Sequence, residues 1–201
     1  MTTSGKRGAL LVLASLLCAG LAAAEEQRSA AQMMDDLMYG RGPIGGPFTL
    51  TDHTGRRRSD AEFRGKLMIV YFGYSYCPDV CPTDLMAITQ ALNSLGPLAT
   101  QVQPVFITID PERDTLVLAE YVSAFHPSLL GLTGSPEEVR AVATAYKVFY
   151  AKVQGERNGE YSIDHAGVIY LIASDGKYLG FMPPQTNPDR LAEVLRKNLA
   201  N

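Results

Sequence analysis

The sequence has few of the residues that usually react or bind metals, and each scarcity narrows what the chain can do. It contains three cysteines, three histidines and no tryptophan among 201 residues. Basic residues are also few, with 18 lysines and arginines against 21 acidic residues, so the charge excess typical of nucleic-acid-binding proteins is missing. There are no internal repeats, low-complexity tracts or long runs of one charge. Since 46% of the residues are hydrophobic, the chain can still bury the core of one domain.

The first 24 residues have the composition of an export segment. Lys6 and Arg7 supply positive charge, residues 8–20 are apolar, and Ala22, Ala23 and Ala24 offer a small-residue cleavage site. This order predicts a signal peptide over residues 1–24 and an exported, periplasmic protein. The alternative is an uncleaved anchor that tethers the protein to the inner membrane, because residues 8–24 reach the lower limit of length for a membrane span.

Cleavage after residue 24 would remove Cys18 and leave two cysteines, an even number for an exported chain. Cys18 could instead carry a lipid, but Leu17 before it is bulkier than the usual lipoprotein pattern accepts. Residues 25–46 end in a cluster of glycines and prolines and are interpreted as a linker. Residues 47–201 are then the folded domain.

The two remaining cysteines follow an apolar run. Residues 67–72 predict a buried strand that stops at Gly73, and the segment Cys77-Pro78-Asp79-Val80-Cys81-Pro82 predicts a loop that opens a helix. Both thiols are therefore expected at the carboxyl end of a strand, the edge at which open α/β sheets tend to bind ligands.

The spacing of four residues restricts the chemistry of this pair. With helix-like backbone between them, Cys77 and Cys81 face the same way, about 6 Å apart at Cα, close enough for a disulfide or for two thiolates on one soft metal ion. A helix starting near Pro82 is expected to place its positive end beside Cys81 and lower the pKa of that thiol. The residues alone leave two other interpretations open, a structural disulfide and two inert buried thiols.

Elsewhere, strand and helix patterns alternate early in the chain and a hairpin comes late. Strands are predicted at residues 48–51, 67–72, 102–109, 129–133, 168–173 and 178–181, and a hairpin at residues 149–153 and 161–163. Helices are predicted after the cysteines, over residues 115–125, from the capping box at Ser135, and from Asn187 to Leu199. This order favours an α/β domain of three layers, α/β/α, with a mixed central sheet and an N-terminal β-hairpin. The cysteine pair after the central strand makes a thioredoxin-like arrangement the expected one.

Four segments together resemble the Sco/SenC family of copper chaperones: residues 71–82, 107–115, 130–134 and 164–172. The resemblance extends from about residue 46 to residue 199. It implies a thioredoxin-like fold and one copper ion per chain, bound by Cys77, Cys81 and His165. It also implies delivery of copper to the binuclear copper site of a respiratory cytochrome oxidase, or reduction of the thiols of that site. Ser75-Tyr76 and Leu116 depart from the family, which often has Thr-His and Pro there.

The chemistry of the three side chains agrees with this implication. Two thiolates and one imidazole suit Cu(I), and tolerate Cu(II) when a further ligand is added. The expected partners are the oxidase subunit that receives copper and another copper chaperone or thiol reductase, with membrane association if the N-terminal segment is not cleaved. The alternative function is a periplasmic thiol-disulfide oxidoreductase in which Cys77 and Cys81 are the redox-active pair. A peroxide-reducing enzyme is disfavoured, because a peroxidatic cysteine needs no partner four residues away.

The other polar candidates have bland interpretations beside functional ones. His53 and His126 are expected to face solvent or to cap local structure. Asp164 either orients His165 or lies on the surface, and Asp79 either contacts the metal or a partner or begins a helix. Residues 110–114, Asp-Pro-Glu-Arg-Asp, are assigned a structural or partner-docking role and no catalysis.

Overall fold

The structure, a computed structural model, describes residues 30–155 and 160–200. The predicted signal peptide lies outside these residues. Within the described part of the chain, no helix is long and apolar enough to cross a membrane. Helix α2 (Ala30–Met38) lies within the segment interpreted as a linker, and a compact unit begins at Leu37. Ile44 and Phe48 are already buried in the core of that unit.

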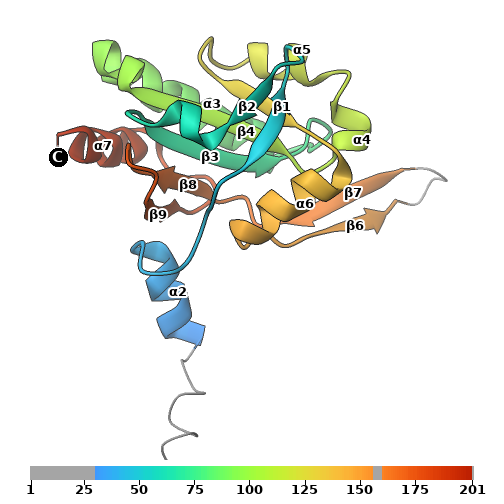
Figure 1. The fold of residues 1–201 in the computed structure, drawn as a ribbon, viewed down its shortest axis with the longest axis horizontal. Coiled ribbons are helices and arrows are strands. Elements are labelled where there is room, and N and C mark those ends of the chain that lie inside the picture. Colours follow the sequence, from blue (N-terminus) through green and yellow to red (C-terminus); the bar gives the residue numbers. More distant parts are fainter. Residues whose placement is uncertain (1–29, 156–159, 201) are drawn as a thin grey trace, which may run out of the picture. The chain divides into compact units, whose positions relative to one another are not determined.

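The unit is built on a mixed sheet in the order β2-β1-β5-β4-β3-β8-β9 (Figure 1). The parallel strands are β3 (Leu67–Gly73), β4 (Val102–Thr108) and β5 (Leu130–Thr133). The antiparallel strands are β1 (Thr49–Asp52), β2 (Arg57–Ser59), β8 (Ile169–Ile172) and β9 (Tyr178–Met182). Strand β3 lies between β4 and β8 and every residue in it is buried, as its unbroken apolar run predicts. The mixed sheet and the β1–β2 hairpin are therefore as predicted.

Helices cover both faces of the sheet. On one face, Tyr71 stacks near Phe106, and the Tyr71 hydroxyl reaches Asp84 in helix α3 (Val80–Leu95). Helix α7 (Pro188–Leu199) packs against α3, and α5 (Leu118–Ser123) brings Tyr121 onto Phe106. Because side chains alternate along a strand, Phe72 faces the other way. It packs there on Tyr146, directly after helix α6 (Pro136–Ala145). The three layers are thus α/β/α.

Two predicted helices differ from the observed ones. Helix α3 begins at Val80 and not near Pro82, so Cys81 already lies in its first turn. The helix expected over residues 115–125 is shorter, α5 (Leu118–Ser123), and a separate short helix that was not predicted, α4 (Pro111–Asp114), precedes it. The reason is that Pro111 starts a turn directly after β4, and Asp114 at its end is held inward by hydrogen bonds.

The late hairpin does not join the main sheet. Strands β6 (Tyr150–Gln154) and β7 (Tyr161–His165) pair only with each other in the described residues, with Tyr150 opposite His165.

The capping boxes at Ser59 and Ser135 are both formed, the second as the sequence predicts.

Candidate metal centre

The two cysteine side chains meet at the start of α3, at the carboxyl end of β3. Cys77 lies in the loop before the helix and is half-buried, whereas Cys81 is fully buried in the first turn, and both are free thiols. Asp79, at the N-cap, makes no capping hydrogen bond with its side chain. The backbone N–H of Cys81 donates to Cys77 Sγ at 3.5 Å. The Cys77 sulfur therefore takes the place of a capping group at the positive end of the helix.

This arrangement shifts the pKa values of the two thiols in opposite directions. A hydrogen bond from the Cys81 thiol lowers the pKa of Cys77 to about 3 despite partial burial, with further help from His165 and from backbone N–H groups. The same hydrogen bond, together with burial, raises the pKa of Cys81. The expectation that Cys81 has the lowered pKa is wrong. The helix begins two residues earlier than predicted, so its free N–H groups point at the preceding cysteine.

His165 completes the group from the end of β7. Its Nε2 lies 3.6 Å from Cys81 Sγ, and the donor atoms of Cys77, Cys81 and His165 all lie within 4.8 Å of one another. The ring meets the edge of Tyr74 at 6.1 Å between centroids. Its Nδ1 is buried and makes no hydrogen bond with any described residue. The structure thus brings together the three side chains that the family resemblance implies.

The donor set fits a soft ion. Two sulfurs and one imidazole nitrogen match Cu(I) and are also accepted by zinc, which usually takes a fourth ligand. Among the described residues, these three form the one cluster of histidine, cysteine and acidic side chains close enough to share an ion. Neither Asp79 nor Asp164 belongs to it, and both are exposed.

Asp164 points away from the site, because it alternates with His165 along β7 and no hydrogen bond joins their side chains in the described part of the chain. The surface interpretation of Asp164 is therefore the correct one. The other two histidines have local roles. His53 Nδ1 accepts from the N–H of Gly131 and ties β1 to β5, and His126 Nδ1 accepts from the N–H of Ser128.

Sequence reasoning missed the residues that shape the wall behind the thiols. A Cβ on Gly73 would stand 2.9 Å from Cys81 Sγ, so only glycine lets the buried sulfur approach the strand this closely. Beside it, the Tyr71 hydroxyl donates to Asp84, whose second oxygen accepts from the N–H of Gln185. Burial raises the pKa of Asp84, against those hydrogen bonds. An acidic residue within the apolar stripe of α3 was the available clue.

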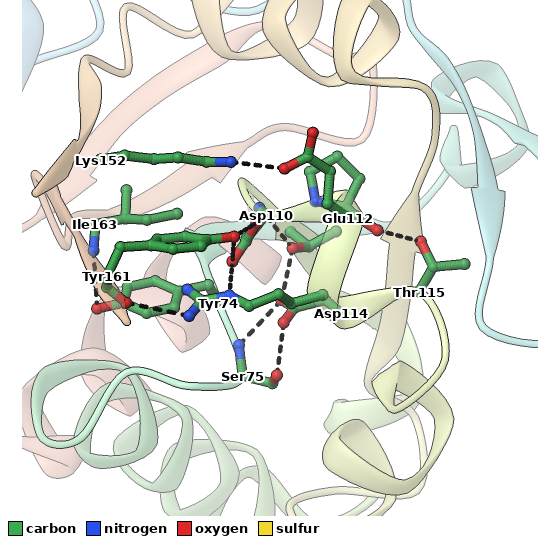
Figure 2. A network of polar contacts seen from close by, with 12 residues as sticks. Tyr74, Ser75, Asp110, Glu112, Asp114, Thr115, Lys152, Tyr161 and Ile163 are labelled. Carbon is green, nitrogen blue, oxygen red and sulfur yellow. Dashed lines mark hydrogen bonds and ion pairs between the residues drawn. The ribbon is translucent and has the colours of Figure 1, made fainter. Parts of the chain in front are cut away.

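Residues 110–114 form a polar network beside the metal centre (Figure 2). Asp114 is buried and accepts from the N–H and hydroxyl of Ser75 and from the hydroxyl of Thr108. Asp110 is also buried; it accepts from the Tyr161 hydroxyl and pairs with Arg113. The first set fixes the loop before Cys77, and the second set reaches across to the hairpin that carries His165. These contacts support the structural role predicted for residues 110–114, and the alternative role in partner docking stays a prediction.

The fold and this centre together define a class, a thioredoxin-like domain with a Cys-x-x-x-Cys pair and a histidine from a separate hairpin. The family model described as SCO1/SenC matches residues 38–200. The chain belongs to this family.

Individual relatives agree. The chain is 38% identical over 205 residues to the mitochondrial SCO2 homolog of Bos taurus, covering 98% of this chain and 77% of the bovine protein. It is 42% identical over 157 residues to the SCO2-like protein of Rickettsia felis, covering 77% of each. Among solved structures, Bradyrhizobium japonicum ScoI with copper bound is 40% identical, with a TM-score of 0.72 over 77% of this chain and 99% of that one.

Proposed function

We propose that this protein is a copper chaperone that binds one copper ion through Cys77, Cys81 and His165. The observation that carries the proposal is the convergence of two sulfurs and one imidazole nitrogen within 4.8 Å at the edge of the sheet. The similar ScoI structure of Bradyrhizobium japonicum holds copper, which supports copper over zinc as the cargo. The thiol with the lowered pKa, Cys77, supplies a thiolate without a strong base.

The destination of the copper follows from the family resemblance. We propose delivery to the binuclear copper site of a respiratory cytochrome oxidase, with the oxidase subunit as the receiving partner and another copper chaperone or thiol reductase upstream. Three donors suit a carrier, because a copper ion that lacks a fourth protein ligand can accept one from the receiving protein before it leaves. An exported, periplasmic location, either soluble or tethered, completes the proposal.

The test is an anaerobic Cu(I) titration of the reduced full-length protein against a chromophoric chelator. We expect one tight copper per chain, and loss of tight binding in Cys77→Ala and in His165→Ala. His126→Ala is the matched control, because His126 bonds only within its own turn among the described residues, and it is expected to bind as the parent does. The absence of a tight site in the parent would overturn the proposal.

A second function has one feature in its favour: the half-buried Cys77 thiol, whose pKa is lowered, lies beside the buried Cys81 thiol, whose pKa is raised. In an oxidoreductase, Cys77 would attack a disulfide of the partner and Cys81 would resolve the mixed disulfide. Two electrons would pass to the partner, two thiols would form on it, and Cys77 and Cys81 would be left as a disulfide. Turnover of a protein disulfide by a parent that binds no copper tightly would favour this function instead.

A further inference from the structure

The hairpin that carries His165 has no ladder bonds to the main sheet in the described residues, so something else must fix the position of the third ligand. Along β7, the residues Tyr161, Ile163 and His165 point to one face, because they alternate with exposed neighbours. Ile163 is buried in the core and His165 reaches Cys81. Tyr161, the outermost of the three, meets the loop after β4.

That meeting is built around one guanidinium group. Arg113 lies over the Tyr161 ring, 3.6 Å from its centroid, and Nη1 donates to the Tyr161 carbonyl at 3.1 Å. The Arg113 Nε donates to Asp110, and the Tyr161 hydroxyl donates to the same carboxylate at 2.9 Å. Asp110, only 1% exposed, is thereby shared between the loop and the hairpin. Figure 2 shows the Tyr161 hydroxyl directed at the Asp110 carboxylate.

The same arginine also lies near Tyr74, the aromatic residue that packs against His165 in the metal centre. Its guanidinium lies 5.8 Å from the centroid of Tyr74, and the Tyr74 hydroxyl accepts from the N–H of Ile163 in the middle of β7. The ring of Tyr74 in turn meets the ring of His165 edge to face. Arg113 therefore holds the hairpin at Tyr161. It also packs against Tyr74, the residue whose ring contacts His165.

We infer that Arg113, with Asp110 and Tyr161, is a positioning group that sets the place of His165 in the metal centre. Metal-bound histidines usually have their second nitrogen held by a hydrogen bond, which orients the ring. Here Nδ1 of His165 has no such partner among the described residues, so the ring orientation depends on Tyr74 and on the placement of β7. The contact of Arg113 with Tyr161 fixes that placement from four residues away. This inference rests on the proposed copper site.

The principal variant is Arg113→Lys in the full-length protein. It keeps a positive charge beside buried Asp110 but loses the flat guanidinium that stacks on Tyr161 and bonds two groups at once. We expect Cu(I) affinity to fall about tenfold, the low end for groups that orient a metal ligand. The matched control is Arg190→Lys on α7. Arg190 forms an exposed ion pair with Glu193, so this variant is expected to leave the Cu(I) affinity unchanged.

A double-mutant cycle separates positioning from a general structural effect. If Arg113 acts through His165, Arg113→Lys weakens tight copper binding in the parent, but in a His165→Ala background it changes the weaker residual Cu(I) affinity of the two thiols less than about twofold. An equal loss in both backgrounds would overturn the inference. Loss of copper binding in His165→Ala, with no effect of Arg113→Lys, would overturn it while leaving the proposed function intact. Absence of tight copper binding in the parent would overturn both.

Hydrogen exchange of the copper-free protein gives a second readout. We expect the amides of β6 and β7 to exchange faster in Arg113→Lys, with β3 and α3 unchanged. If Arg113→Lys fails to fold, Tyr161→Phe carries the test, because it removes one hydroxyl and keeps the ring under the guanidinium. A smaller loss of affinity that again depends on His165 is expected, and unchanged affinity together with unchanged exchange would overturn the inference.

Discussion

The thiol half and the imidazole half of the centre are held by different physics. Cys77 and Cys81 lie at the junction of β3 and α3, where every residue of the strand is buried and Cys81 has no exposed surface. His165 lies on a two-stranded hairpin. Among the described residues of β6 and β7, Ile163 is buried and Tyr150 and Tyr161 are partly buried against the core, and polar contacts join the hairpin to a loop. Apolar burial is strong and without direction, whereas each hydrogen bond or ion pair is directional and contributes only a small net free energy.

This difference gives the proposed copper chaperone a way to hold an ion and still release it. The Cys81 sulfur is as stable as the domain itself, since moving it requires breaking the core, and the half-buried Cys77 sulfur accepts a hydrogen bond from the Cys81 N–H. The His165 imidazole can move away from the two sulfurs when the hairpin opens. This costs less free energy than breaking the core, because a local opening costs only the contacts that it breaks. Variants on each side can test this contrast between cysteines fixed at the core and a histidine fixed by polar contacts to a loop.

The largest effect is expected from truncating the core behind the thiols. Leu85 in α3 is fully buried beneath the sheet, so Leu85→Ala should lower the free energy of unfolding by about 2–5 kcal/mol. Denaturant unfolding measures this change. Leu116→Ala is the control, because Leu116 is 93% exposed and should change stability by less than about 0.5 kcal/mol. A small effect of Leu85→Ala would mean that the thiol half is not core-held.

The next effect comes from crowding the buried sulfur. Gly73→Ala would place a Cβ 2.9 Å from Cys81 Sγ and 3.0 Å from the Phe106 ring, and should cost about 1–3 kcal/mol of stability. Because Cys81 must shift, Cu(I) affinity should fall as well. Gly131→Ala is a matched control, since its Cβ would stand equally close to Leu118 and Val122 but far from the thiols. Equal losses of copper affinity in both variants would contradict the argument.

A third prediction concerns the protonation of the pair. The pKa of Cys77 is lowered, so the thiolate persists well below pH 8.5, where an ordinary cysteine is half ionised. Alkylation of the reduced copper-free protein should therefore occur at Cys77 below neutral pH and fall only when the pH drops through the lowered pKa. Cys81→Ala removes the principal hydrogen bond and should move the midpoint upward. The remaining thiol of Cys77→Ala should react slowly, because Cys81 is buried.

Much of the thiol half could be predicted from sequence, and the reasons are local. The apolar run before Gly73, the prolines around the cysteines and the capping box at Ser135 depend on residues close in the chain. The sequence predicts the start of α3 two residues late, and it does not show the hydrogen bond between the two thiols or the burial of Cys81, which together set the pKa order. The error arose because Pro82 is compatible with the first turn as well as with the first position of a helix.

For the imidazole half, the sequence identifies the residue but does not predict how it is positioned. His165 was named by resemblance, but its distance from Cys81 depends on contacts across 84 positions that no local pattern encodes. Arg113 and Tyr161 are 48 residues apart, and nothing in either segment predicts that they meet. Directional contacts between distant loops leave no periodic trace in a sequence, unlike an apolar strand.

The smallest effect is expected at the rim of the hairpin. Lys152 in β6 pairs with Glu112, but both side chains are largely exposed, at 43% and 62%, and such pairs contribute little. Lys152→Met should change the free energy of unfolding by less than about 0.5 kcal/mol. It should also leave Cu(I) affinity within about twofold of the parent. Chelator competition and denaturant unfolding measure the two quantities, with Glu112→Gln as the variant that breaks the pair from the other side.

The outcome at Lys152 sharpens the contrast, because this residue and Arg113 contact the same tyrosine ring. Lys152 Nζ lies 4.6 Å from the Tyr161 centroid and Arg113 lies at 3.6 Å. They differ in burial and in the bonds that they make: Arg113 also pairs with buried Asp110, whereas Lys152 pairs with an exposed carboxylate. If both variants weakened copper binding equally, the exposed contact of Lys152 would hold the hairpin as much as the buried contact of Arg113 does. If only Arg113→Lys weakens it, the buried, directional half of the contact fixes the third ligand.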